Sequence, residues 1–305
     1  MQDTMRAIRY HEHGTADVLR LEQVPIPKPN DGEVLVRVRA AGVNPVDWKQ
    51  RSGMNPDLPA IPGIDLSGVV EEVGDGVVGF TVGQEVCGTG RGTYADYAIA
   101  TDGHLVSKPA GMTFLEAATI GVGARTAWAA LFQAAGLQRG DSILIQGAAG
   151  GVGMWGVQFA KWKGAKVIGT ASTENLGFLK SMGADEAVDY TNTSIDIVNG
   201  VDIVLDTVGG EVQRQSWQTL KKDGVLVTIV GEPDMKLAKD YGVRALRVGR
   251  MVNSIKVFDT VNELFAAGKV SPSIQEIFPL EQAKQAHELS ETSHGKGRIV
   301  LNISV

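Results

Sequence analysis

The chain has 305 residues, more than one ordinary domain needs, and 43% of them are hydrophobic, which is enough for a sizeable buried core. The net charge of -6 provides no basic surface for a phosphate backbone, so we exclude nucleic acid as the main partner. No apolar run approaches the roughly 20 residues that span a bilayer, and the first residues lack the apolar core of a signal peptide. We therefore expect a cytoplasmic protein with no membrane partner. The single cysteine, Cys87, excludes an intrachain disulfide and a zinc site made of several thiolates.

The first third of the chain alternates short β-branched runs with Gly and Pro. Strands are predicted over residues 33–39, 66–73, 84–88 and 94–99, which indicates a barrel-like β module. From about Ala117 onward, helical stretches separate compact strands, a rhythm typical of a doubly wound parallel sheet. The six strands predicted for this sheet cover residues 142–146, 166–170, 186–189, 202–206, 225–230 and 245–248. The last extended segment, residues 297–303, is expected to rejoin the first module.

A glycine-rich turn joins the first strand of this sheet to a helix. Its glycines at 147, 150 and 153 follow the spacing G-x-x-G-x-x-G, and the apolar strand and the helix lie on either side. Glycine allows a tight turn and lets backbone N–H groups approach a pyrophosphate, which the helix N-terminus also attracts. The alternative is a turn that serves only packing. We expect the dinucleotide to be bound here by Gly147, Ala149, Gly150, Gly151, Val152 and Gly153.

The end of the second strand decides between NADP and NAD. Enzymes of this fold that prefer NAD usually place Asp or Glu there, roughly 20 residues after the glycines, to bind the ribose 2′-OH. This chain has Ser172, a small neutral donor that tolerates a 2′-phosphate. Glu174 would repel that phosphate if it pointed inward, and we expect it to face solvent. Tyr190 could contact the same phosphate or be a surface residue of no function. The sequence thus predicts NADPH, and leaves NADH open.

Several stretches of the chain are similar to one family. The glycine turn within residues 140–161, together with residues 5–10, 40–47, 62–70, 121–128 and 206–210, resembles the medium-chain dehydrogenase/reductase superfamily, in particular its zeta-crystallin-like quinone oxidoreductase branch. The resemblance covers nearly the whole chain. It implies a GroES-like β-barrel catalytic domain, residues 1–117 and 272–305, and a doubly wound Rossmann NADP(H)-binding domain, residues 118–271. It also implies a homodimer.

The positions that bind catalytic zinc in other members of the superfamily differ in this chain. Asn44 stands where zinc enzymes have a cysteine, and Ile64-Asp65 stands in place of His-Glu. A short connection, residues 90–94, replaces the lobe that holds four cysteines. The five histidines are scattered and each is expected at the surface. Because zinc needs convergent Cys, His or carboxylate ligands, the sequence predicts no metal.

The resemblance also suggests residues that take part in the reaction. Asn44 would position substrate or nicotinamide, and Lys49 resembles the lysine of enone and alkenal reductases, although it could equally be a solvated helix residue. Asp65 is expected to bond a backbone group or Lys49, and Asp47 to cap the turn or form an ion pair. The remaining residues that the resemblance places near the cofactor are Thr126, Gly209, Val230, Gly231 and Arg298.

Without a metal, the acceptor must already be electrophilic, as quinones and α,β-unsaturated carbonyls are. The sequence therefore predicts an NADPH-dependent reductase that transfers hydride to one of these small molecules. The alternatives are a non-catalytic NADPH-binding sensor or structural protein of the same fold, and a zinc alcohol dehydrogenase.

Overall fold

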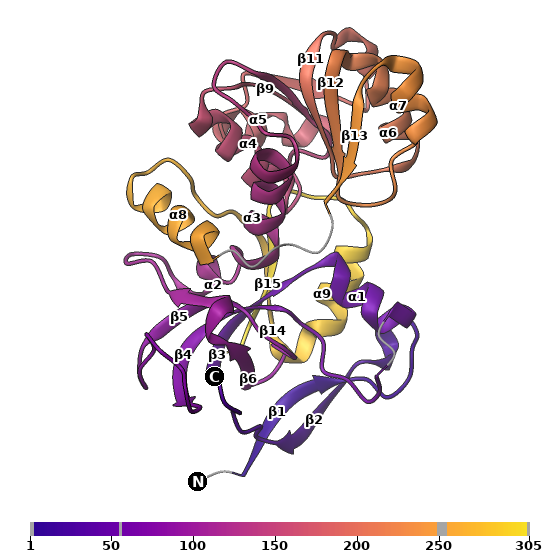
Figure 1. Ribbon diagram of the computed structural model, residues 1–305. Coiled ribbons are helices and arrows are strands. Elements are labelled where there is room, and N and C mark those ends of the chain that lie inside the picture. Colours follow the sequence, from indigo (N-terminus) through magenta and orange to yellow (C-terminus); the bar gives the residue numbers. More distant parts are fainter. Residues whose placement is uncertain (1–2, 55–56, 249–254, 304–305) are drawn as a thin grey trace. The chain divides into compact units, whose positions relative to one another are not determined.

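The computed structural model describes residues 3–54, 57–248 and 255–303 (Figure 1). The chain divides into two compact units: residues 1–122, 253–294 and 298–305 form the first, and residues 123–252 and 295–297 form the second. This division differs from the boundaries expected from the resemblance, because helix α8 (Ile255–Ala266) groups with the first unit. The reason is local packing: α8 lies against β7, and the Asn262 side chain donates to the Ser107 carbonyl at 3.1 Å.

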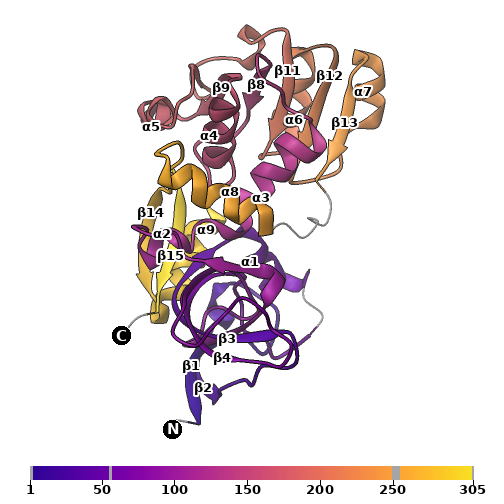
Figure 2. The same cartoon turned by 60° about the vertical axis from the view of Figure 1, so that its left-hand side comes forward.

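The first unit is built around the long strand β3, which changes partners along its length. Its first half pairs with β6, its second half pairs with β15, and β4 pairs with nearly all of it, in each case antiparallel. The sheet continues from β4 to β5 and β7, and β14 lies parallel to β15. The strands of this unit are β1 (Thr4–Arg9), β2 (Arg20–Pro25), β3 (Glu33–Val43), β4 (Asp65–Val73), β5 (Glu85–Thr89), β6 (Tyr97–Thr101), β7 (Leu105–Ser107), β14 (Ile274–Pro279) and β15 (Arg298–Asn302). The pairing of β15 with β3 confirms that the end of the chain rejoins the first module (Figure 2).

Apolar side chains on the inner faces of these strands form the core of the first unit. Val34, Val36, Leu66 and Leu301 belong to one buried cluster, which helix α9 completes with Ala283 and Ala286. The helices of this unit are short: α1 (Pro45–Lys49), α2 (Phe114–Ala117), α8 and α9 (Ala283–Glu291), and α3 (Gly121–Trp128) runs from the first unit into the second.

The second unit is a six-stranded sheet in which every pair of neighbours is parallel. Its strands are β8 (Ser142–Ile145), β9 (Lys166–Ala171), β10 (Glu186–Asp189), β11 (Val201–Asp206), β12 (Leu220–Thr228) and β13 (Arg244–Arg247). Their spatial order, β10-β9-β8-β11-β12-β13, corresponds to 3-2-1-4-5-6 in chain order. This is the order of a dinucleotide-binding sheet, whose ligand lies where the strand order reverses, between β8 and β11. The predicted doubly wound sheet is confirmed.

Helices cover both faces of this sheet. Right-handed crossovers place α4 (Gly153–Lys163) and α5 (Leu176–Ser181) on one face, and α6 (Gly210–Ser216) and α7 (Met235–Tyr241) on the other (Figures 1 and 2). Leu144, Ile168, Val204 and Leu226 pack with Trp217 in a buried cluster under the second pair of helices. Among the described residues, no helix has the length and apolar composition that crossing a membrane requires.

Candidate active site

Three neighbouring strands of the first unit bring together polar residues from distant parts of the chain. Asn44 directly follows β3, Asp65 begins β4 and Arg298 begins β15. The register pairs Gly42 with Asp65 and Val43 with Ile299, so the ends of the three strands meet at one place in the sheet. All three side chains are buried, with 4% of Arg298 exposed and none of Asn44 or Asp65.

Hydrogen bonds join these three residues, which we call the Arg298 cluster. One guanidinium nitrogen, Nη2 of Arg298, donates to Asp65 Oδ2 at 2.6 Å and to Asn44 Oδ1 at 2.8 Å. The Asn44 amide donates to Asp65 Oδ2 at 3.0 Å, and the backbone N–H of Val122 donates to Asp65 Oδ1 at 2.7 Å. Asp65 therefore has the backbone partner that the sequence suggested, and its cationic partner is Arg298. The cluster holds one positive and one negative charge in a fixed, buried arrangement.

Helix α1 starts from this cluster and carries Lys49. Asp47 occupies the third helical position and its Oδ2 accepts from the Asn44 N–H at 2.8 Å and from the Tyr94 hydroxyl at 3.0 Å. The helix is capped by Asn44, so Asp47 supports the cap instead of being the cap residue. Burial raises the pKa of Asp47 to about 7. The Lys49 side chain is half-buried, with Nζ at 5.4 Å from the centre of the Trp48 ring.

The histidines and the cysteine do not gather around this cluster. Among the described residues, no group of three or more His, Cys, Asp or Glu side chains could hold a metal ion. Cys87 is buried, and burial raises the pKa of its thiol to about 12. The surface position expected for every histidine is wrong for His287, which is fully buried, with its Nδ1 3.0 Å from Nη1 of Arg51. A helix residue that faces a core through a polar contact carries no sequence signal that separates it from a surface residue.

In the second unit, the glycine-rich turn lies at the carboxyl end of β8, where α4 begins. Gly147 has φ of 62°, and a Cβ there would lie 2.6 Å from Thr207 Oγ1; a Cβ on Gly153 would lie 2.4 Å from the Gly147 carbonyl oxygen. These two positions therefore require glycine. Gly150 is less confined, because a Cβ there would meet only the Gly147 oxygen at 3.3 Å.

Buried side chains hold the backbone of this turn, and several of its N–H groups have no partner among the described residues. The Gly147 N–H donates to Thr170 Oγ1 at 3.1 Å, and that hydroxyl donates to the Gln146 side chain at 2.7 Å. The Gln146 amide donates in turn to the Ser216 hydroxyl at 2.9 Å, which ties the turn to α6. Within the part of the chain that the structure describes, four backbone N–H groups of the turn have no hydrogen-bond partner: Ala149, Gly151, Val152 and Gly153. Free N–H groups at a helix N-terminus suit a phosphate group.

Ser172 and Tyr190 lie at the carboxyl ends of the next two strands. Ser172 is half-buried and its hydroxyl accepts from the Asn175 amide at 3.0 Å, whereas Glu174 is exposed, as expected. Tyr190 is 55% exposed and lines a pocket of about 350 Å³ together with residues 191–195, Gln146 and Thr170. Next to it, hydrogen bonds from Thr173, Thr191 and Asn192 hold the pKa of Asp189 well below its usual range.

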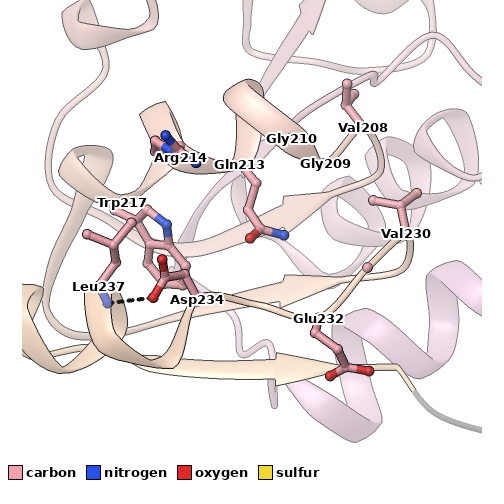
Figure 3. Close-up of a pocket in the computed structure, with 11 residues that line it drawn as sticks. Val208, Gly209, Gly210, Gln213, Arg214, Trp217, Val230, Glu232, Asp234 and Leu237 are labelled. Carbon is pink, nitrogen blue, oxygen red and sulfur yellow. Dashed lines mark hydrogen bonds between the residues drawn. The ribbon is translucent and has the colours of Figure 1, made fainter.

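A second pocket of the same unit, about 430 Å³, opens at the carboxyl ends of β11 and β12 (Figure 3). Gly209, Val230 and Gly231, three of the predicted cofactor residues, line it. Val208 and Val230 stand at one end of the pocket, and Trp217 and Leu237 stand at the other (Figure 3). Thr126 is half-buried on α3 and is not among the residues that line the two pockets.

Sequence reasoning missed several polar residues that support the site. Tyr94 and Arg51 are fully buried beside helix α1, and Gln146, Thr170 and Ser216 are buried beneath the glycine-rich turn. The only signal for the second group was its position at strand ends next to the glycines. The first group has none, because its contacts join segments far apart in the chain.

Two family descriptions match the chain: residues 30–110 match the alcohol dehydrogenase GroES-like domain, and residues 182–301 match the zinc-binding dehydrogenase domain. The quinone oxidoreductase of Mus musculus is 35% identical, over 97% of this chain and 96% of that protein. The 2-methylene-furan-3-one reductase of Solanum lycopersicum is 34% identical, over 98% of this chain and 79% of that protein. The structure of the quinone oxidoreductase from Coxiella burnetii superimposes with a TM-score of 0.93 at 34% identity, over 99% of this chain and 100% of that chain.

These matches, together with the Rossmann sheet and its glycine-rich turn, define a nicotinamide-dependent oxidoreductase. A mycobacterial protein whose structure contains NADPH is also similar, with a TM-score of 0.89 and 30% identity over 98% of this chain and 100% of that chain. The chain belongs to the medium-chain dehydrogenase/reductase superfamily, in its zeta-crystallin-like quinone oxidoreductase branch. The expected fold class, a GroES-like β-barrel domain with a doubly wound Rossmann domain, is confirmed.

Proposed function

We propose that this protein is an NADPH-dependent reductase that transfers hydride to a quinone or an α,β-unsaturated carbonyl without zinc. The observation that carries the proposal is the Arg298 cluster. Its buried guanidinium bonds to Asn44 and Asp65, the two residues at positions that correspond to the zinc site of other members of the superfamily. The two residues therefore share a buried organic cation as their common partner.

The donors present around Asn44 do not fit zinc. Tetrahedral zinc needs three or four Cys, His or carboxylate ligands that converge on one point. The Arg298 cluster offers one carboxylate, Asp65, which is already paired with a guanidinium, and one neutral amide. A second cation beside Arg298 would be repelled in this buried place. We therefore route no step of the reaction through a metal.

The residues of the second unit fit a dinucleotide. The free N–H groups of the glycine-rich turn are suited to the pyrophosphate, and the strand order reverses at that turn. We propose that Gly147, Ala149, Gly150, Gly151, Val152 and Gly153 hold the pyrophosphate, and that Gly209, Val230, Gly231 and Thr126 lie near the rest of the cofactor. When bound, the reduced nicotinamide supplies hydride from its C4 carbon. We also propose that Arg298 lies near the cofactor, while its Nη2 atom bonds to Asp65 and Asn44.

The preference for NADPH over NADH rests on Ser172 and Tyr190. The Ser172 hydroxyl and the Tyr190 phenol are neutral groups that can donate to a 2′-phosphate, and no Asp or Glu replaces Ser172. The Ser172 hydroxyl is 3.5 Å from the carboxylate of Glu174, and Asp189 remains anionic nearby. These two carboxylates reduce the affinity for a phosphate, so we propose that NADH is accepted as a weaker cofactor.

The names of two relatives support the substrate class. One is a quinone oxidoreductase, and the other reduces a furanone that carries a methylene carbon next to its ketone. Both acceptors are activated by conjugation, so hydrogen bonds suffice to stabilise the negative charge that develops on oxygen. We propose that Lys49 donates to this oxygen and that Asn44 and Asp65 keep the surrounding backbone in place. The solvent supplies the proton that completes the product.

Parallel stopped-flow assays test this function. Purified protein should oxidise NADPH faster than NADH with 1,2-naphthoquinone or a short 2-alkenal as acceptor, and elemental analysis should find no stoichiometric zinc. Binding of NADPH without turnover across a broad panel of acceptors would instead support a non-catalytic NADPH sensor or structural protein. Stoichiometric zinc would support the alcohol dehydrogenase alternative. The cytoplasmic location and the homodimer remain predictions.

A further inference from the structure

A second set of polar side chains, most of them buried, lies in the first unit beside helix α1. Arg51 is 1% exposed although it carries a full positive charge. Its Nη2 donates to Glu291 Oε1 at 2.6 Å, its Nε donates to the Gly14 carbonyl at 3.1 Å, and its Nη1 faces His287 Nδ1 at 3.0 Å. Arginine has no acceptor, so His287 Nδ1 must accept and its proton lies on Nε2.

These contacts close a ring around the segment that carries Lys49. His287 packs edge-on against the Tyr94 ring, with 5.6 Å between ring centres, and the Tyr94 hydroxyl donates to Asp47 at 3.0 Å. Asp47 and Arg51 lie on the same segment, four residues apart. The ring therefore runs from Asp47 through Tyr94 and His287 to Arg51 and back along the chain. We call Asp47, Tyr94, His287, Arg51 and Glu291 the α1 clamp.

The composition of the α1 clamp is poorly explained by stability alone. Burying the guanidinium of Arg51 costs several kcal/mol, and its ion-pair partner Glu291 is exposed, so the pair offsets only part of that cost. Apolar residues of similar volume often stabilise a buried position as well or better. Burial lowers the pKa of His287 to about 3, so the imidazole stays neutral and keeps accepting from Arg51 at neutral pH. A directional ring of this kind fixes one geometry, which an apolar cluster does not.

The segment that the α1 clamp holds is short, and members of the clamp, Asp47 and Arg51, stand at its two ends. Helix α1 has five residues and continues into a π-helical turn, Gln50–Met54, which carries Arg51. Even the two together are too short to be stable as an isolated helix, and Lys49 lies between Asp47 and Arg51. The clamp and the Arg298 cluster meet at Asn44, whose N–H bonds to Asp47 and whose side chain bonds to Arg298. We propose that Tyr94, His287 and Arg51 are positioning residues that hold Lys49 and Asn44 in the geometry needed for reduction of the substrate. This inference rests on the function proposed above.

Conservative variants test the α1 clamp through kcat and KM. Tyr94→Phe removes the hydrogen bond to Asp47, and Glu291→Gln removes the negative charge that faces Arg51; both changes keep the volume. With saturating NADPH and 1,2-naphthoquinone, each should lower kcat about fivefold, the equivalent of one hydrogen bond, and leave the Kd for NADPH unchanged. The matched controls are Tyr97→Phe and Glu288→Gln. No hydrogen bond of the Tyr97 hydroxyl is found among the described residues, and Glu288 is an exposed residue of the same helix as Glu291. Both controls should keep the kcat of the wild type.

Two substitutions of His287 separate positioning from packing. Asn places an acceptor near the position of Nδ1, whereas Leu supplies apolar volume without an acceptor. If the hydrogen bond to Arg51 positions the segment, His287→Asn retains more kcat than His287→Leu. A packing role predicts the reverse order, with the better activity and the higher Tm in the Leu variant, and that result overturns the proposal. Should either variant fail to fold, Tyr94→Phe and Glu291→Gln decide: kcat values equal to the controls overturn the proposal as well.

Lys49→Ala distinguishes the failure of this inference from the failure of the proposed function. A Lys49→Ala variant with normal kcat contradicts the role of Lys49 in the reaction, and with it the reason for a clamp. A Lys49→Ala variant with reduced kcat, combined with clamp variants that match their controls, contradicts the clamp alone.

Discussion

Replacing Asp65 by Asn tests the electrostatics of the Arg298 cluster without changing its volume. In the wild type, the two carboxylate oxygens of Asp65 accept from the guanidinium at 2.6 Å, the Asn44 amide at 3.0 Å and the Val122 N–H at 2.7 Å. All these donors point at Asp65, which is fully buried. An amide in its place would turn an NH₂ group toward at least one of them. The guanidinium would then lack a counter-charge in a region closed to water.

The expected cost of Asp65→Asn is about 3–5 kcal/mol in the free energy of unfolding, the range found when one partner of a buried ion pair is removed. Arg298→Met should cost a similar amount, because it leaves the Asp65 carboxylate unpaired. The double variant should cost clearly less than the sum of the two single changes, with a coupling energy of about 2 kcal/mol or more, because no unpaired charge remains.

Urea unfolding at pH 7, followed by circular dichroism, measures these free energies. Hydrogen exchange of β4 and β15 shows that the loss falls on the first unit, where the cluster lies. A matched control is Glu85→Gln, which removes a partly exposed ion pair with Lys108 and should cost less than about 1 kcal/mol. If Asp65→Asn cost no more than this control, the Arg298 cluster would be solvated and the reasoning above would be refuted.

Three further outcomes are expected. Gly150→Val should raise the Kd for NADPH at least about tenfold, because a branched side chain on the turn blocks the approach of the pyrophosphate. Titrations followed by nicotinamide fluorescence measure this Kd, and an unchanged affinity in a folded variant would contradict the assigned role of the turn. Lys49→Ala should lower kcat by about 10- to 100-fold with little change in the Kd for NADPH, and an equal loss in both would indicate a cofactor residue instead. Asp47 has its pKa raised from 3.8 to about 7, so its contribution to stability is fully present below pH 3.8 and is lost as the pH rises through 7. The stability of Asp47→Asn relative to the wild type should therefore rise between pH 5 and pH 8 by a few kcal/mol, since each pKa unit corresponds to about 1.4 kcal/mol. Urea unfolding of both proteins across this pH range measures the difference, and parallel pH profiles would count against the expectation.

The strands of the second unit could be predicted well because their signals are local. Each is a short apolar run between turn residues, and β10 was predicted at its observed bounds, Glu186–Asp189. The largest deviation is β12, which begins at Leu220 instead of Val225. Its first residues include Lys221, Lys222 and Asp223, which are exposed and break the apolar pattern. The strand β12 pairs with β11 at Leu220 and again from Val225 onward, with a register irregularity between these positions. A pattern of hydrophobicity does not reveal such an irregular extension of a strand.

The sequence allowed us to predict residues of the candidate site, but not the contacts among them. Asn44 and Asp65 were identified because they stand at family positions, and the structure brings them within 3.0 Å of each other. Their common partner, Arg298, is 233 residues away from Asp65 in the chain. A sequence gives the order of strands, but the antiparallel register of β15 on β3 decides which side chains meet. The same holds for His287, whose burial depends on how α9 packs in the first unit.

The hydrogen-bond donors of the first unit that still lack a partner decide which substrates it can activate. A metal with an open coordination position polarises a carbonyl directly. The Nη2 group of Arg298 is instead committed to Asp65 and Asn44, and the Asn44 amide is committed to Asp65. Lys49 is half-buried and forms no ion pair with any residue that the structure describes, which leaves its ammonium free to donate. A single hydrogen-bond donor provides modest stabilisation of an alkoxide, so simple ketones would react slowly. Quinones and enones spread the developing charge through conjugation, and for this reason we propose them as the acceptors.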